Sequence, residues 1–183
     1  MAMNNYMDFA ENDYNYFRHS YESGFVANAM AADAQEICEK YMKHIIDTFC
    51  RNTKTQEEQN TFDSVMKTHN LMKLYRYIEN NTECSFDKET KQALNSVNGF
   101  YFTARYPGDE SIEVTKEDLD LCNEAVQKCR KEIFDIQEKL QSRSVEETKQ
   151  PEKEKIMHES VISREKKQKS HNFTEWREDE LEL

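Results

Sequence analysis

Runs of apolar residues spaced three and four positions apart constrain the fold of this chain more than any other feature. The clearest run comprises Leu119, Cys122, Val126, Cys129, Ile133, Ile136 and Leu140. This spacing places all its members on one face of an α-helix. The 183-residue chain also contains only 3 Gly and 2 Pro, too few turn-forming residues for a many-stranded β-sandwich or barrel. The pattern therefore predicts an all-α fold.

Four further segments have helical spacing. They cover residues 6–21, residues from about 26 to 50, a stretch that includes Leu71, Leu74, Tyr75 and Ile78 and stops near Asn81, and residues 87–104. Residues 52–56 have the composition of a loop, and Pro107-Gly108 is expected to end the fourth segment. Thr115 and Asp118 form a variant capping box before the last helix. The sequence thus predicts an antiparallel up-down bundle of four to five helices.

The composition of the chain changes near Ser142. Residues 143–183 are dense in charged side chains and contain few large apolar ones. Such a segment cannot bury enough apolar surface to offset the entropy lost on folding. We therefore expect a helical bundle over residues 1–142 and a charged, flexible tail over 143–183, disordered or weakly helical. The end of that tail, with Phe173 and Trp176 among acidic residues, fits either a docking segment or a solvated tail.

Charge and cysteine content exclude several classes of protein. The formal net charge of −11 disfavours broad, non-specific binding to the phosphate backbone of nucleic acids, although it leaves a local basic site open. No apolar window approaches the ~18 residues of a membrane span, so no membrane association and a cytoplasmic location are expected. The five cysteines form no CxxC pair. Neither a metal site nor a cofactor is therefore predicted.

Arg105, Tyr106 and His69 are the candidate ligand-binding and catalytic residues. The guanidinium of Arg105, just before a proline turn, is suited to a phosphate, and Tyr106 to stacking on a base. Alternatively, Arg105 pairs with a carboxylate of a neighbouring helix while Tyr106 packs on the turn. His69 is suited to act as a general base or phosphate ligand, because imidazole is the side chain that commonly does so near neutral pH, or else it caps the helix that follows.

Lys40 and Lys43 complete the candidate site. They follow Glu36 and Glu39 by four residues each, so surface i,i+4 ion pairs are one expectation. The other places these lysines with Arg105 in a small phosphate-binding cleft. The aromatic residues of segment 6–21 either fill the core or form the interface of a homodimer.

Four segments, in this order, resemble one known family. Residues 25–43 are similar to the second helix of the HEPN (higher eukaryotes and prokaryotes nucleotide-binding) domain. Residues 68–74 resemble its Thr-His-Asp-Leu-x-x-Leu element, with Asn70 where Asp is common. Residues 100–108 resemble its Tyr-x-x-x-Arg-Tyr-Pro segment, and residues 114–118 open a final helix as they do in the family.

The resemblance implies an up-down bundle, frequent homodimers and frequent pairing with small nucleotidyltransferases. Many members are ribonucleases of toxin–antitoxin or defence systems, with a His four to six residues after an Arg. No His occurs among residues 106–111. We therefore expect a dimeric module related to nucleotides or nucleic acids, or a partner of a nucleotidyltransferase or defence protein, without catalysis of its own. The alternative is a metal-independent ribonuclease that uses Arg105 and His69.

Overall fold

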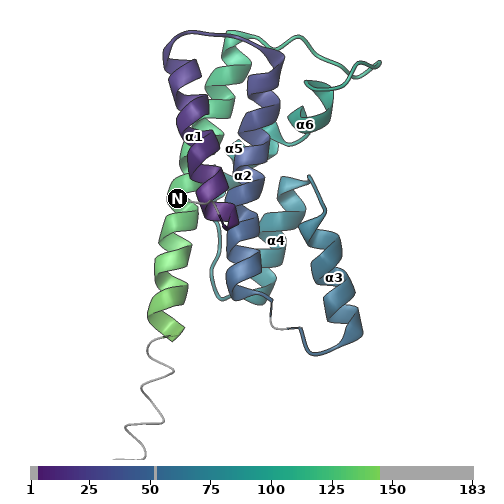
Figure 1. Ribbon diagram of the computed structural model, residues 1–183, viewed down its shortest axis with the longest axis vertical. Helices are drawn as coiled ribbons and strands as arrows, with labels where there is room; N and C mark the ends of the chain where they lie inside the picture. Colours follow the sequence, from purple (N-terminus) through teal and green to yellow (C-terminus); the bar gives the residue numbers. More distant parts are fainter. Residues whose placement is uncertain (1–3, 52, 145–183) are drawn as a thin grey trace, which may run out of the picture. The chain divides into compact units, whose positions relative to one another are not determined.

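The computed structural model describes residues 4–51 and 53–144, which form helices joined by turns and loops and contain no strand. Six helices follow one another (Figure 1): α1 (Tyr6–Glu22), α2 (Asn28–Phe49), α3 (Gln56–Met66), α4 (Leu71–Asn81), α5 (Lys88–Val97) and α6 (Phe100–Thr103). A further helix covers residues 116–138, and residues 139–144 are helical as well. The predicted all-α helical bundle is confirmed. The expected tail beyond residue 144 lies outside the described residues.

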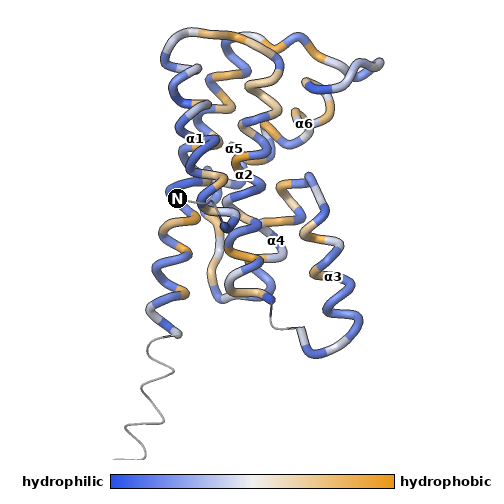
Figure 2. Tube along the Cα trace, viewed as in Figure 1, coloured by the Kyte–Doolittle hydropathy of each residue, from blue (hydrophilic) through white to orange (hydrophobic). Residues whose placement is uncertain are grey.

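The second helix, α2, is the centre of the bundle because it contacts α1, α4, α5 and α6. Its small residues Ala31 and Ala34 and its large residues Ile37, Tyr41 and Ile45 are fully buried. Figure 2 shows apolar and polar residues alternating along the helices, as one buried face per helix requires. Burying one such isoleucine stabilises the fold by roughly 2 kcal/mol relative to exposure.

A single carboxylate joins α1 to two other helices. Arg130 of the last helix donates from Nε and Nη2 to the two oxygens of Glu11, at 2.8 and 2.9 Å. The hydroxyl of Tyr41, on α2, donates to Glu11 Oε1 at 2.6 Å. Burial raises the pKa of Glu11, but the hydrogen bonds from Arg130 and Tyr41 outweigh it and hold that pKa below its ordinary value of 4.5.

Replacing Glu11 by glutamine is expected to lower the free energy of unfolding by about 1 kcal/mol at pH 7, because charge-assisted hydrogen bonds are lost. Since folding lowers this pKa, the carboxylate stabilises the native state above pH 4.5, and the contribution disappears as the pH falls through the native pKa. Urea unfolding at pH 7 and pH 3 should show the difference between wild type and Glu11→Gln shrinking at low pH. The exposed Glu117→Gln variant is the control. An equal difference at both pH values would contradict this assignment.

The helix α3 is not among the predicted helices. Residues 52–56 have the composition of a loop, and the next expected helix is the one that includes Leu71. Thr55 and Glu58 form a capping box at its start: the N–H of Glu58 donates to Thr55 Oγ1 at 3.2 Å, and the N–H of Thr55 donates to Glu58 Oε2 at 3.0 Å. Only Phe62 of this helix is buried. A single buried residue produces no apolar periodicity, so the capping box was the one available signal.

The prediction of one helix over residues 87–104 is wrong, because the chain breaks between α5 and α6. Gly99 adopts a φ of +124°, a conformation that residues with a Cβ rarely adopt. The side chain of Asn98 accepts a hydrogen bond from the N–H of Leu71 at 2.8 Å. The break is thus held by a contact with α4 that local spacing cannot reveal, and α6 starts in a new direction with its three aromatic residues.

Candidate functional site

Gln35 ties three distant segments together on the inner face of α2. Its side chain is 1% exposed. Nε2 donates to the carbonyl oxygen of His69 at 2.6 Å, and Oε1 accepts from the N–H groups of Gly99 and Tyr101 at 2.9 and 2.8 Å. Since these backbone groups find no partner within a helix, Gln35 fixes both the chain before α4 and the start of α6.

Glu39 lies one turn further along α2 and orients His69. Its side chain is 3% exposed. Its Oε2 atom lies 3.3 Å from Lys43 Nζ and 3.1 Å from His69 Nδ1. Burial raises the pKa of Glu39, and the charges of Lys43 and His69 partly offset that rise. Because Nδ1 of His69 faces the carboxylate, the Nε2 edge of the ring is left for another partner.

The ring of Tyr101 contacts both His69 and Arg105. His69 stacks on it with 3.8 Å between centroids and 12° between planes, and Arg105 Cζ lies 4.7 Å from the same centroid. The distance from the centroid of the His69 ring to Arg105 Cζ therefore cannot exceed the sum of these two distances. Phe102 meets the edge of His69 at 90°, with 5.7 Å between centroids. Three aromatic rings and one guanidinium thus form a contiguous cluster.

Arg105 is paired with two carboxylates of α2. Its Nη2 atom donates to Glu36 Oε2 at 3.2 Å and to Asp33 Oδ1 at 3.4 Å. Burial raises the pKa of Asp33, and the positive charge of Arg105 partly offsets this effect. Of the two roles expected for Arg105, the structure therefore shows pairing with carboxylates of a neighbouring helix. A phosphate would have to compete with two carboxylates for the Nη2 atom of this guanidinium.

The two lysines form the i,i+4 pairs that their spacing predicts. Lys40 lies 2.9 Å from Glu36 and also bonds Asp13 of α1, while Lys43 pairs with Glu39. Lys43 is buried, with 8% of its surface exposed. Lys40 therefore shares Glu36 with Arg105, and Lys43 shares Glu39 with His69. Neither lysine lines the cavity beside His69.

That cavity, which we call the amide pocket, has a volume of about 260 Å³. It is lined by Gln35, Thr68, His69, Asn70, Asn98, Gly99 and Phe102. Phe102 is 55% exposed, and the ring of Tyr106, which is 53% exposed, lies 6.3 Å from that of Phe102 between centroids. Amides, an imidazole and exposed rings around a small volume suit a flat heteroaromatic molecule.

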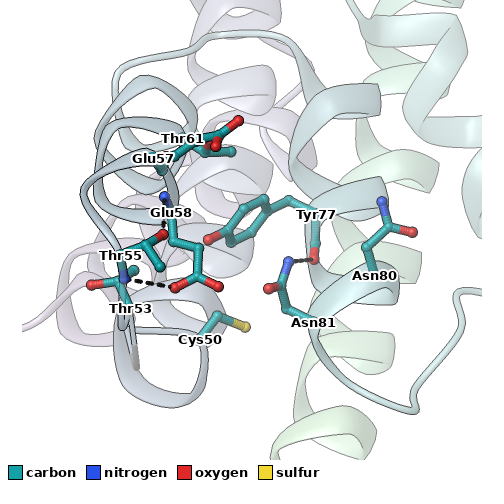
Figure 3. Close-up of a pocket in the computed structure, with 9 residues that line it drawn as sticks. All are labelled: Cys50, Thr53, Thr55, Glu57, Glu58, Thr61, Tyr77, Asn80 and Asn81. Atoms are coloured by element: carbon teal, nitrogen blue, oxygen red, sulfur yellow. Dashed lines mark hydrogen bonds between the residues drawn. The ribbon is translucent and has the colours of Figure 1, made fainter.

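Two other pockets are acidic. One of about 200 Å³ is lined by Asp13, Tyr16, Asp33, Glu36 and Lys40. The other, of about 450 Å³, lies between α3 and α4 and is lined by nine residues that Figure 3 shows as sticks. Glu57 and Glu58 are the only charged residues in this lining, and Tyr77 reaches from α4 towards Glu58. Negative charge without an opposing cation makes it unsuited to a phosphate-bearing ligand.

Sequence reasoning missed four residues of the site. Gln35 and Glu39 are polar residues among the buried positions of α2, next to Ala34 and Cys38. A polar residue on a buried helix face needs a hydrogen-bonding partner, so their position was a usable signal. Tyr101 and Phe102 lie within a Phe-Tyr-Phe triplet, but their role depends on the break at Gly99.

Across 4–51 and 53–144, no group of three or more His, Cys, Asp or Glu side chains is arranged to hold a metal ion. Among these residues, none of the helices has the length and apolar character needed to cross a bilayer.

Comparison with known proteins gives one match. The family model of the HEPN domain matches residues 59–140, which span α3 to α6 and most of the last helix. The match includes three of the four segments that resemble this family; residues 25–43, on α2, lie outside it. No curated protein and no solved structure matches the chain significantly.

Proposed function

We propose that this chain, which carries a HEPN domain at residues 59–140, is a binding module for a nucleotide or a short RNA segment and has no catalysis of its own. The observation that carries the proposal is the amide pocket, where polar edges lie beside exposed aromatic rings. Aromatic side chains bind bases by stacking on their faces, and unstacked RNA bases are recognised in this way.

The pairing of Arg105 supports binding without catalysis. A group that stabilises a reacting phosphate must direct its charge at the place where negative charge develops. The Nη2 atom of Arg105 is directed at Glu36 and Asp33 instead. No lysine or arginine lines the amide pocket, so the pocket offers neither of these side chains to replace Arg105 at a transition state.

Replacing Phe102 by alanine is expected to weaken nucleotide binding about tenfold, because one base–aromatic stack contributes roughly 1–3 kcal/mol. Calorimetric titration of the full chain with GMP and with a short single-stranded RNA measures the effect. Phe102 is 55% exposed, so stability should change little. The matched control is Phe25→Ala, whose ring is 58% exposed between α1 and α2. Equal affinities for wild type and Phe102→Ala would contradict the proposed site.

A ribonuclease is the second candidate, and the contact between Glu39 and His69 favours it. A carboxylate bound to one ring nitrogen orients a histidine for proton transfer at the other. Incubation of labelled single-stranded RNA with wild type, His69→Ala and Arg105→Ala tests this mechanism. Intact RNA supports the binding module. Cleavage that both variants abolish would replace our proposal, and cleavage that neither affects would exclude these residues as its source.

The expected partners belong to the same proposal. Self-association through α1 is supported by Phe9 and Tyr16, which are 44% and 64% exposed, because aromatic residues are enriched at interfaces. The mass of the chain in solution, measured by light scattering, tests for a dimer. A nucleotidyltransferase or another defence protein as partner, a cytoplasmic location, and the division at residue 142 stay predictions.

A further inference from the structure

The two asparagines of the amide pocket already use their carbonyl oxygens. Asn70 Oδ1 accepts from the N–H of Lys73 at 3.0 Å, and Asn98 Oδ1 accepts from the N–H of Leu71 at 2.8 Å. These N–H groups belong to the first turn of α4, and that of Lys73 also donates to the backbone carbonyl oxygen of Asn70 at 3.1 Å. A backbone N–H only donates, so the atom facing it must be the amide oxygen. The orientation of both side chains is thereby fixed.

Both asparagine side chains keep unused hydrogen-bond donors, their Nδ2 groups. Within the described residues, neither Nδ2 atom donates a hydrogen bond, and the two amides are neighbours because they bind N–H groups of one helical turn. The hydroxyl of Thr68 likewise accepts from the N–H of Asn70 at 3.2 Å and keeps its own hydrogen. Gln35 is fully engaged. Thr68, Asn70 and Asn98 therefore each keep an unused donor, while the oxygen of each already accepts one hydrogen bond.

Donors of this kind discriminate between bases. An asparagine recognises adenine by donating to N7 and accepting from the amino group at position 6, and this needs a free amide oxygen. The amide oxygens of Asn70 and Asn98 each already accept a backbone N–H, which leaves one lone pair on each, whereas neither Nδ2 group donates a hydrogen bond within the described residues. A 6-oxo purine instead presents two adjacent acceptors, O6 and N7. We propose that the amide pocket selects bases with a carbonyl oxygen where adenine has an amino group, such as hypoxanthine and guanine. This inference rests on the proposed function.

The preference arises at the edge of the base rather than at its face. Phe102 is 55% exposed and offers a ring face, whereas one face of His69 is covered by Tyr101. Stacking is tolerant of base identity. The phosphate is not needed for the distinction, since Arg105 is paired with Glu36 and Asp33. A nucleoside without phosphate is therefore a sufficient probe.

Inosine and adenosine form a matched pair of probes, because inosine has a carbonyl at the purine position where adenosine has an amino group. In calorimetric titrations of the full chain, inosine is expected to bind roughly tenfold more tightly than adenosine. The wild-type ratio alone tests the inference. Equal affinity for the two nucleosides overturns the inference and leaves the proposed function standing. Binding of neither nucleoside, GMP or RNA overturns both.

Asn70→Asp and Asn98→Asp test whether the asparagine donors cause the preference. Aspartate still accepts the same backbone N–H, and it is as good a helix cap as asparagine, but it presents an acceptor in place of the amide donors. The preference for inosine should be lost or reversed in each variant. The control is Asn123→Asp, which introduces the same charge on the last helix and keeps the bond from Gln127. An unchanged ratio in folded Asn70→Asp and Asn98→Asp overturns this assignment.

Discussion

Replacing Gln35 by leucine is expected to lower the free energy of unfolding by about 3 kcal/mol and to abolish nucleotide binding. The substitution keeps the volume of the side chain but removes both its donor and its acceptor. The carbonyl of His69 and the N–H groups of Gly99 and Tyr101 would then lack their partner in a buried place. Each buried polar group left without a partner costs about 1–3 kcal/mol, and local relaxation recovers part of the sum.

Binding is lost in the same variant because Gln35 positions both sides of the amide pocket. Without it, the chain that carries His69 and the chain that carries Phe102 are no longer joined through α2. Urea unfolding measures the stability, and titration with GMP measures the binding. The exposed Gln127→Leu variant on the last helix controls for the change in composition and should shift the free energy of unfolding by less than about 0.5 kcal/mol. A loss below 1 kcal/mol for Gln35→Leu would contradict this role.

Replacing Glu39 by glutamine is expected to destabilise the fold by about 3 kcal/mol at pH 7, because it leaves a buried ammonium without its counter-charge. Lys43 is 10% exposed at its side chain, and its Nζ atom has Glu39 as its ion-pair partner. Glutamine has nearly the same shape as glutamate, so the loss in free energy of unfolding measures the effect of the charge rather than of packing. His69 would lose the carboxylate that orients its ring.

A double variant separates the lost charge from other effects. When Lys43→Met is combined with Glu39→Gln, no buried charge remains unpaired, so we expect the pair to be less destabilising than the sum of the two single changes. Urea unfolding of wild type, both single variants and the double variant completes the cycle. Additive losses would show that the two side chains do not interact in the folded state.

Local patterns in the sequence were sufficient for most helices. The spacing of Ile37, Tyr41 and Ile45 predicted α2, and the reciprocal hydrogen bonds of Thr115 and Asp118 are present at 2.9 and 3.2 Å. The spacing of four residues also predicted the ion pairs of Lys40 and Lys43. These features depend on residues within one or two turns of each other, so the order of residues along the chain is enough to predict them.

The sequence by itself therefore determined an all-α bundle, the boundaries of α1 and α2 and the capped last helix. It also determined the resemblance to the HEPN family, whose model matches residues 59–140. Only the tertiary structure decided that His69 and Arg105 both contact the ring of Tyr101, that the chain breaks at Gly99, and that Gln35 joins the chain at His69 to the start of α6. Helix periodicity and capping are set by neighbours in sequence. The site is set by hydrogen bonds and stacking between α2, the start of α4 and α6, whose relative placement no local pattern encodes.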